Sequence, residues 1–237
     1  MSSLLLETKG LQAGYGRKQV VFDLDMKLNT GEILAIFGHN GSGKSTSMRT
    51  ILGVLPPLGG QVFYEGRDIT GTGSRVNVRE NKMALIPSER FVFQDLSVTD
   101  NLLLGGANDP DEKRRAENMD MVYQMFPILK ERHAQLAGTM SGGQQRMVSL
   151  GIALMSNPKL LILDEPSLGL APSVVEQIFS EVRDLVKKTG LSVILLEQNV
   201  GQALKISDRG YVMRSGRIVI EETIEQMNAR DSYWDFF

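Results

Sequence analysis

The sequence predicts an α/β fold with a mostly parallel central sheet, and three observations support this. Apolar, strand-like runs alternate with stretches of helical periodicity, at 33–37, 83–86, 160–163 and 191–196. A glycine-rich loop, Gly38–Ser45, follows the first run and leads directly into a helix start. Two carboxylates, Asp164 and Glu165, end the run at 160–163. In open α/β sheets, ligands bind beyond the carboxyl ends of the strands.

Length and composition limit the possibilities further. With 237 residues, the chain can form one substantial core, or one domain with an inserted lobe. A formal net charge of −2 gives no electrostatic basis for nucleic-acid binding, and the absence of cysteine excludes disulfides and cysteine metal sites. Residues 1–7 lack the features of a signal peptide, and no apolar run reaches the ~20 residues that cross a bilayer. We therefore expect a soluble chain that reaches a membrane only through partners.

The glycine-rich loop matches the pattern G-x-x-x-x-G-K-S. Glycines let successive backbone N–H groups point into one concavity, and the following helix adds its N-terminal dipole to the same anion site. Lys44 is expected to reach the terminal phosphates of a nucleotide, and the Ser45 hydroxyl to ligate Mg²⁺. An ordinary glycine-rich turn is the alternative, but a strand before the loop and a helix after it favour a phosphate site. The predicted phosphate-binding residues are Gly38, His39, Asn40, Gly41, Ser42, Gly43, Lys44, Ser45 and Thr46.

The acidic pair at the end of the strand 160–164 predicts metal binding and activation of a water molecule. Asp164 is expected to hold Mg²⁺, directly or through water, and Glu165 to orient and deprotonate an attacking water. Pro166 is expected to force the chain out of the strand immediately afterwards. An acidic turn without function is the alternative, and the upstream phosphate loop favours the functional interpretation.

The remaining elements follow from periodicity and turn residues. Residues 20–28 alternate as in a half-buried antiparallel strand, and Tyr15 is expected in a glycine-flanked loop, either as surface packing or as a π-face for a base. Ser141 opens a helix, and two glycines behind it present free amides. A plain helix cap by Ser141 is favoured from these residues alone. Further expected elements are strands at 61–64 and 83–86, helices at 75–82, 111–126 and 174–186, a helix capped by Thr99, and a hairpin at 211–220.

The order of these motifs resembles that of the ATP-binding subunits of ABC transporters, across essentially the whole chain. Ser141-Gly142-Gly143-Gln144 looks like the signature motif of that family, at the position where the family has it. The resemblance implies a P-loop NTPase fold of ABC ATPase type: a RecA-like, mostly parallel core with an N-terminal antiparallel β subdomain and an inserted helical lobe. It implies a single domain over 1–237, with the core in 1–88 and 156–237 and the lobe in about 89–155.

The same resemblance implies the cofactors and a composite site. Two subunits of the family sandwich two molecules of ATP, with Mg²⁺, so that the signature of one grips the γ-phosphate on the P-loop of the other. Tyr15 matches the residue that stacks on adenine, and Ser167–Ala171 matches the loop that crosses the dimer interface. The resemblance therefore adds these residues to the ATP site: Tyr15, Ser141, Gly142, Gly143 and Gln144.

Local strings are most similar to one of the two ATPases of the branched-chain amino-acid importers. They are Pro166–Pro172, Leu195–Asn199 with Gln202–Leu204, Ser207–Val212, and Ile86–Arg90 with Val92 and Phe93. This implies an ATPase that is cytoplasmic and peripheral on the inner face of the cell membrane. It also implies a second ATPase subunit in a homo- or heterodimer, polytopic permease subunits and, indirectly, an extracytoplasmic solute-binding protein, with no nucleic acid.

Two positions depart from the general pattern of the family. Ser88 stands where most members have a Gln that touches Mg²⁺ and water, and Gln198 stands where most have a His that contacts the γ-phosphate. A Gln amide can donate a hydrogen bond but cannot take a proton at neutral pH. The expected catalytic residues are Glu165, Lys44 and Gln198, and the expected metal ligands are Ser45 and Asp164.

Three alternatives to amino-acid import remain open from the sequence. One is import of urea, an amide or another small solute, and another is a soluble ABC ATPase that acts outside transport. The third is a nucleotide-binding regulatory subunit that scarcely hydrolyses ATP, because of Ser88 and Gln198. The aromatic end, Tyr233–Phe237, is expected either to pack on its own domain or to contact a partner.

Overall fold

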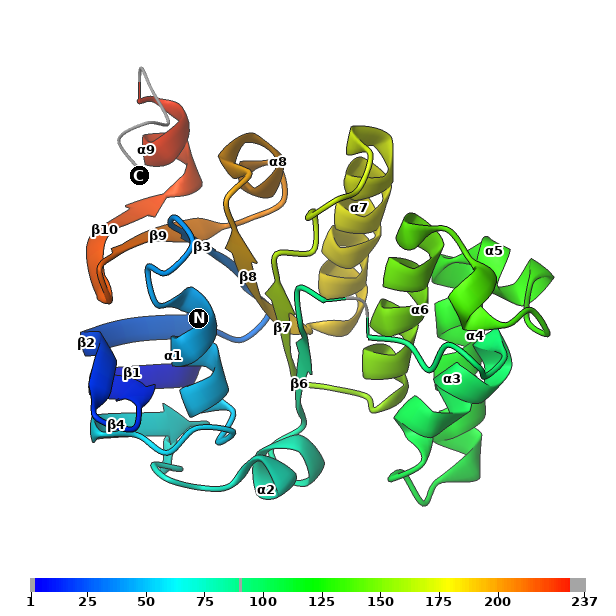
Figure 1. The fold of residues 1–237 in the computed structure, drawn as a ribbon, viewed down its shortest axis with the longest axis horizontal. Helices are drawn as coiled ribbons and strands as arrows, with labels where there is room; N and C mark the ends of the chain where they lie inside the picture. The colour runs from blue at the N-terminus through cyan, green and yellow to red at the C-terminus, as the bar shows by residue number, and fades with distance from the viewer. Residues whose placement is uncertain (1–2, 90, 231–237) are drawn as a thin grey trace.

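The computed structural model describes residues 3–89 and 91–230, which form two β-sheets with helices around them (Figure 1). The strands are β1 (Leu4–Tyr15), β2 (Lys18–Asn29), β3 (Ile33–Phe37), β4 (Gly59–Tyr64), β5 (Arg67–Asp68), β6 (Met83–Ile86), β7 (Leu160–Asp164), β8 (Ser192–Glu197), β9 (Arg209–Arg214) and β10 (Arg217–Thr223). The helices are α1 (Lys44–Ile51), α2 (Ser74–Arg79), α3 (Val98–Gly106), α4 (Glu112–Met125), α5 (Pro127–Glu131), the 3₁₀ helix η1 (Ala137–Thr139), α6 (Gly142–Met155), α7 (Pro172–Thr189), α8 (Val200–Leu204) and α9 (Ile224–Asn228). The predicted α/β class is confirmed, while Tyr233–Phe237 lie outside the described residues.

The larger sheet carries the strands that end at the functional residues. Its order is β10-β9-β3-β8-β7-β6, and its strands run parallel except for β10, which pairs antiparallel with β9. Every residue of β3, β7 and β8 is buried, as expected for central strands covered on both faces. Because parallel strands all end at the same edge, the segments that follow β3, β7 and β8 lie beside one another.

This sheet is the middle layer between two hydrophobic cores. Ile33, Ala35 and Phe37 of β3 belong to the core that also contains residues of α6 and α7. Leu34 and Ile36, on the opposite face, belong to the core that α1 and the smaller sheet complete. Figure 1 shows the same layers, with α7 and α6 on one side of the larger sheet and β1 and β2 on the other. Successive residues of β3 therefore contribute to different cores, following the period of two.

The smaller sheet is antiparallel in the order β2-β1-β4-β5, and β2 contains the strand predicted at 20–28. Its strand β1 was not predicted, because the regular alternation breaks where Gly10 has a φ of 54° and the register shifts between Thr8 and Leu11. Tyr15, expected in a loop, is instead the last residue of β1.

Helices α3 to α6 form a group beside the larger sheet. The N-cap of α3 is Ser97, whose Oγ accepts a hydrogen bond from the Asp100 N–H, so the prediction of Thr99 was wrong. Ser97 has the extended backbone that a cap requires, whereas Thr99 already lies inside the helix. Helices α3 and α6 approach closely at Gly105, where a Cβ would lie 2.1 Å from the carbonyl oxygen of Ile152.

A buried arginine joins α6 to the segment that follows β6. The guanidinium of Arg146 donates to the carbonyl oxygens of Pro87 and Ser88, each over 2.7 Å. The planar fork of an arginine suits two neighbouring acceptors in this way. Ser88 is therefore connected through its backbone to the helix that Ser141–Gln144 opens.

Candidate functional site

The glycine-rich loop turns between the end of β3 and the start of α1, and its conformation requires glycine at Gly38. Gly38 has a φ of 153°, and a Cβ there would lie 2.4 Å from the carbonyl oxygen of Met213. A cavity of about 130 Å³ lies against this loop. It is lined by Val20, His39, Asn40, Gly41, Ser42, Gly43, Lys44, Ser45, Thr46 and Glu165. The predicted phosphate loop and the predicted general base therefore share one cavity.

Lys44, the first residue of α1, is buried and lies across its own loop. Its Nζ donates to the carbonyl oxygens of Gly38, over 2.6 Å, and His39, over 3.2 Å. Nζ is also 3.6 Å from Oε1 of Glu165. Burial lowers the pKa of Lys44, and the neighbouring carboxylate of Glu165 opposes that change. The ammonium group is thus aimed into the loop, where a phosphate would meet it.

Two buried oxygen atoms at this end of the sheet lack partners. Among the described residues, Oγ of Ser42 and Oδ1 of Asp164 form no hydrogen bond. Burial raises the pKa of the Asp164 carboxyl, and a hydrogen bond with Ser45 acts in the opposite direction. Buried polar groups in native proteins normally have partners, so both atoms are available to bind a ligand at this edge of the sheet.

Glu165 adopts a conformation that the sequence did not predict. Its φ is 47°, in the left-handed region that is uncommon for residues other than glycine, and its N–H donates to the Leu196 carbonyl over 2.9 Å. The chain therefore leaves β7 at Glu165 itself, one residue before Pro166. Such strained positions cluster at functional sites.

Gln198 connects the loop with the acidic end of β7. Its Nε2 donates to Oε1 of Glu165 over 2.7 Å and to Oδ1 of Asn40 over 3.0 Å. Gln198 directly follows β8, which lies between β3 and β7 in the sheet. The position where the sequence predicted a non-titrating donor is thus in contact with the predicted base.

Tyr15 lies beside α1 and is 46% exposed. Its hydroxyl accepts a hydrogen bond from Nη1 of Arg49 over 3.4 Å, and its pKa is lowered chiefly by a hydrogen bond with Thr46. The ring therefore stands next to the first turn of the helix that follows the phosphate loop, although it does not line the cavity.

The Ser141–Gln144 segment lies apart from this cavity, and none of its residues lines it. Ser141 caps α6 in a capping box: its Oγ accepts from Gln144 N–H over 3.4 Å, and its own N–H donates to Gln144 Oε1 over 3.0 Å. The helix cap by Ser141 predicted from these residues is therefore present. Within a single chain, Ser141–Gln144 and the phosphate loop do not line the same cavity. Ser88 likewise does not line the cavity.

Sequence reasoning assigned no role to Glu197, the last residue of β8. This carboxylate is 1% exposed and accepts hydrogen bonds from both the backbone N–H and the hydroxyl of Ser167, over 2.9 and 2.8 Å. The available signal was a charged residue at the end of an otherwise apolar strand. Since its partner lies thirty positions away, local pattern could not identify it.

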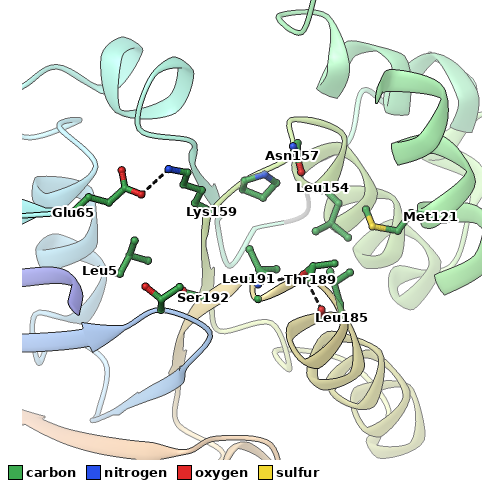
Figure 2. Close-up of a pocket in the computed structure, with 13 residues that line it drawn as sticks. Leu5, Glu65, Met121, Leu154, Asn157, Lys159, Leu185, Thr189, Leu191 and Ser192 are labelled. Carbon is green, nitrogen blue, oxygen red and sulfur yellow. Dashed lines mark hydrogen bonds and ion pairs between the residues drawn. The ribbon is translucent and has the colours of Figure 1, made fainter. Parts of the chain in front are cut away.

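A second cavity, of about 320 Å³, lies where β7 and β8 begin, at the opposite end of these strands from the phosphate loop (Figure 2). Lys159 and Glu65 form an ion pair at its rim over 2.6 Å, and Leu154 and Leu191 contribute apolar surface. It contains none of the predicted site residues, so the phosphate loop remains the candidate site.

Comparison with known proteins agrees with the geometry. The family model described as "ABC transporter" matches residues 21–168. A high-affinity branched-chain amino acid transport ATP-binding protein of Pseudomonas aeruginosa is 45% identical over 224 residues, which cover 92% of this chain and 94% of the relative. A lipopolysaccharide export system ATP-binding protein of Haemophilus influenzae is 31% identical over 225 residues, covering 94% and 92%.

A solved structure confirms the predicted fold class. The crystal structure of a nucleotide-free ATP-binding cassette from an ABC transporter superposes with a TM-score of 0.86, at 27% identity, over 98% of both chains. In residues 3–89 and 91–230, no helix is both long and apolar enough to cross a membrane. The family match, the relatives and the fold agree with the glycine loop and the carboxylates around it, and the chain therefore belongs to the ABC transporter family, as one of its ATPases.

Proposed function

We propose that this ATPase powers the uptake of branched-chain or related amino acids through separate membrane subunits. The 45% identity to a branched-chain amino acid transport ATP-binding protein, over nearly the whole of both chains, carries the proposal. Export is the second candidate, because a lipopolysaccharide export ATPase is 31% identical over a similar length. Import is favoured, since the larger identity belongs to the amino-acid relative.

The phosphate loop, Gly38–Thr46, would hold the triphosphate of ATP. Lys44 is already poised in the cavity, and exchange of its contacts with Gly38 and His39 for phosphate oxygens would give it charged acceptors. The orphaned Oγ of Ser42 would gain a partner from the same ligand. Tyr15, beside Thr46, would present its exposed ring to adenine.

The residues beside the loop fit a magnesium ion bound with the nucleotide. Asp164 Oδ1 is buried without a partner, and the same side chain meets the hydroxyl of Ser45. Among the described residues no group of three or more histidine, cysteine or acidic side chains gathers into a metal site. A sparse protein ligand set agrees with Mg²⁺, which takes one or two protein oxygens plus phosphates and water. When bound, Mg²⁺ would neutralise charge that develops on the phosphates.

Hydrolysis would depend on how Glu165 is oriented. Among the described residues, Gln198 donates to Oε1 and Lys44 lies near the same oxygen, which leaves Oε2 as the oxygen expected to take a proton from the attacking water. Gln198 takes no proton itself, and exchange of its Asn40 contact for the reacting phosphate would give that phosphate an N–H donor. Because Gln198 also donates to Asn40, a movement of the phosphate loop on ATP binding would change the position of this amide.

A second ATPase subunit, identical or not, would complete the site. The Ser141–Gln144 cap at the start of α6 presents helix N–H groups, and these would bind the γ-phosphate on the partner's loop. Because the segment lies outside the cavity of its own chain, its contribution requires a dimer. Full activity is therefore expected only after two ATPase chains associate around ATP.

The helical lobe, in about 89–155, would dock on the membrane subunits. Phe91 and Phe93 are 50% and 45% exposed and contact each other edge to face, with ring centroids 5.9 Å apart. Leu103, Leu104 and Leu136 in the same region are also exposed. Large exposed apolar side chains in one region mark an interaction surface. Arg146 would connect that surface with the start of α6 through Ser88.

The test is to purify the chain from its native membrane with every subunit it retains. The complex is then reconstituted in lipid vesicles with its solute-binding protein, and ATP turnover is measured with leucine, isoleucine, valine or urea. We expect polytopic membrane subunits in the complex and stimulation by the branched-chain amino acids. Stimulation by urea alone, dependence on lipopolysaccharide, or purification without membrane proteins would contradict the proposal.

A further inference from the structure

A buried carboxylate stands at the centre of the functional edge of the sheet. Glu197 ends β8, and in the parallel register it lies opposite Phe37, the residue before the phosphate loop. Burial raises the pKa of Glu197, while hydrogen bonds from Ser167, Asn199 and Gln198 act against this change. Isolation of a carboxylate from water is costly unless hydrogen-bond donors replace the water.

The donors that surround Glu197 come from two separate segments. Oε1 accepts from the Ser167 N–H over 2.9 Å, and Oε2 accepts from the Ser167 hydroxyl over 2.8 Å. Oε2 also accepts from the backbone N–H groups of Gln198, over 3.2 Å, and Asn199, over 3.4 Å. Only an ionised carboxylate offers acceptors on both oxygens and no donor, so it satisfies all these groups together.

Each of these segments carries one member of the predicted catalytic pair. Ser167 lies two residues after Glu165, and Gln198 is itself the residue that donates to Glu165 over 2.7 Å. The N–H of Glu165 also donates a hydrogen bond to the carbonyl oxygen of Leu196, the residue before Glu197 in β8. Glu197 is thus hydrogen-bonded both to the segment that follows Glu165 and to the backbone of Gln198.

We infer that Glu197 is a positioning residue for ATP hydrolysis, which holds the turn after β7 and the turn after β8 in the register that joins Gln198 to Glu165. It does not line the phosphate cavity, its charge raises the pKa of Lys44 less than those of Glu165 and Asp164 do, and it acts through Ser167 and the backbone of Gln198. The inference rests on the proposed function for the roles of Glu165 and Gln198.

Substitution by glutamine separates this role from simple packing. Glu197→Gln keeps the shape, but its NH₂ group must face at least one N–H or O–H donor, which pushes the two turns apart. Ser167→Ala removes the hydroxyl donor only, whereas Ser167→Thr keeps a hydroxyl. Glu225→Gln, on the exposed face of α9, is the matched control for the loss of a charge.

The experiment measures kcat and KM for ATP in the complex purified with its membrane subunits, together with binding of a fluorescent ATP analogue and thermal unfolding. We expect Glu197→Gln to lower kcat at least tenfold, while KM and the Kd of the analogue change less than twofold. Ser167→Ala should lower kcat less, Ser167→Thr should restore it, and the double variant should lose less than the sum of the two single losses, because both changes act on the same contact.

Three results would overturn the inference: unchanged kcat in a folded Glu197→Gln, additive effects in the double variant, or a loss of activity that only follows the unfolded fraction. If Glu197→Gln does not fold, equal kcat for Ser167→Ala and Ser167→Thr would overturn it instead. Failure of the role assigned to Glu165 has a different signature. Glu165→Gln would then retain turnover in the same preparation, whatever the Glu197 and Ser167 variants show.

Discussion

Gln198 donates a hydrogen bond from Nε2 to Oε1 of Glu165 over 2.7 Å. A side chain that does not titrate near neutral pH therefore orients the predicted general base, and the same amide reaches Asn40 in the phosphate loop. Lys44 lies 3.6 Å from that carboxylate oxygen. Under the proposed mechanism this arrangement separates two tasks, since Gln198 would position the carboxylate of Glu165 and Glu165 would accept the proton. The predictions below follow from this geometry and from the buried groups around it.

Replacement of Glu165 by glutamine should remove most hydrolysis and preserve ATP binding. The amide oxygen of the new side chain can still accept from Gln198, so geometry is retained, but it cannot take a proton from water. Loss of a general base costs about 10²–10⁴-fold in rate. Steady-state turnover and the Kd of a fluorescent ATP analogue provide the measurement, with Glu225→Gln as control. Undiminished turnover would refute the assignment of the base.

Gln198→Ala should lower kcat by about tenfold or more, because the donor that orients Glu165 and the link from Glu165 to Asn40 in the phosphate loop are both lost. Gln198→His should restore part of the rate and introduce a pH dependence that the native protein lacks at this position. An imidazole titrates near pH 6.5, so the rate of the histidine variant should change between about pH 5.5 and 7.5. A rate profile parallel to that of the native protein would contradict this prediction.

Asp164→Asn should stabilise the nucleotide-free protein by about 1 kcal/mol, because it replaces a carboxylate whose ionised form is disfavoured by burial with a neutral amide. The folded-state pKa of Asp164 is raised above its unfolded value, so the native state holds the extra proton between the two values. Its contribution to the free energy of unfolding therefore falls as pH rises through that interval. In the Asp164→Asn protein, the free energy of unfolding should change less with pH over this interval. Mg²⁺ with ATP should also stabilise this variant less than the native protein. Equal Tm values for both proteins at all pH values would contradict it.

Arg146→Lys should lower the free energy of unfolding by about 2 kcal/mol, because a single ammonium cannot reproduce the fork that meets the carbonyls of Pro87 and Ser88. For a chain of this size, such a loss lowers Tm by about 4–8 °C. Arg132→Lys, at an exposed position, is the control and should leave Tm unchanged. Similar Tm values for the two variants, measured by calorimetry, would show that the fork is dispensable.

Features that depend on residues close together along the chain were predictable from the sequence. The parallel strands β3, β7 and β8 followed from apolar runs, and the sequence located the phosphate loop between a strand and a helix. The start of α6 followed from Ser141, whose capping box uses residues only three positions apart. In each case the determining interactions lie within one turn or one strand.

Features that depend on contacts between distant segments were missed. Strand β1 owes its position to pairing with β2 and β4, which overrides the interruption at Gly10. The left-handed turn at Glu165 is stabilised through Leu196, and the role of Glu197 exists only because Ser167 lies beside it. None of these relationships has a local signature, because both partners must first be brought together by the sheet.

The self-contacts of Lys44 make nucleotide binding an exchange reaction. Its ammonium group already has carbonyl partners from Gly38 and His39, so a phosphate bound by Lys44 as proposed would replace internal hydrogen bonds rather than satisfy an empty donor. The contribution of Lys44 to ATP affinity would then be the difference between two sets of bonds to the same nitrogen. Product release would then cost less free energy, because the Lys44 ammonium group regains its hydrogen bonds to the Gly38 and His39 carbonyls when the nucleotide leaves.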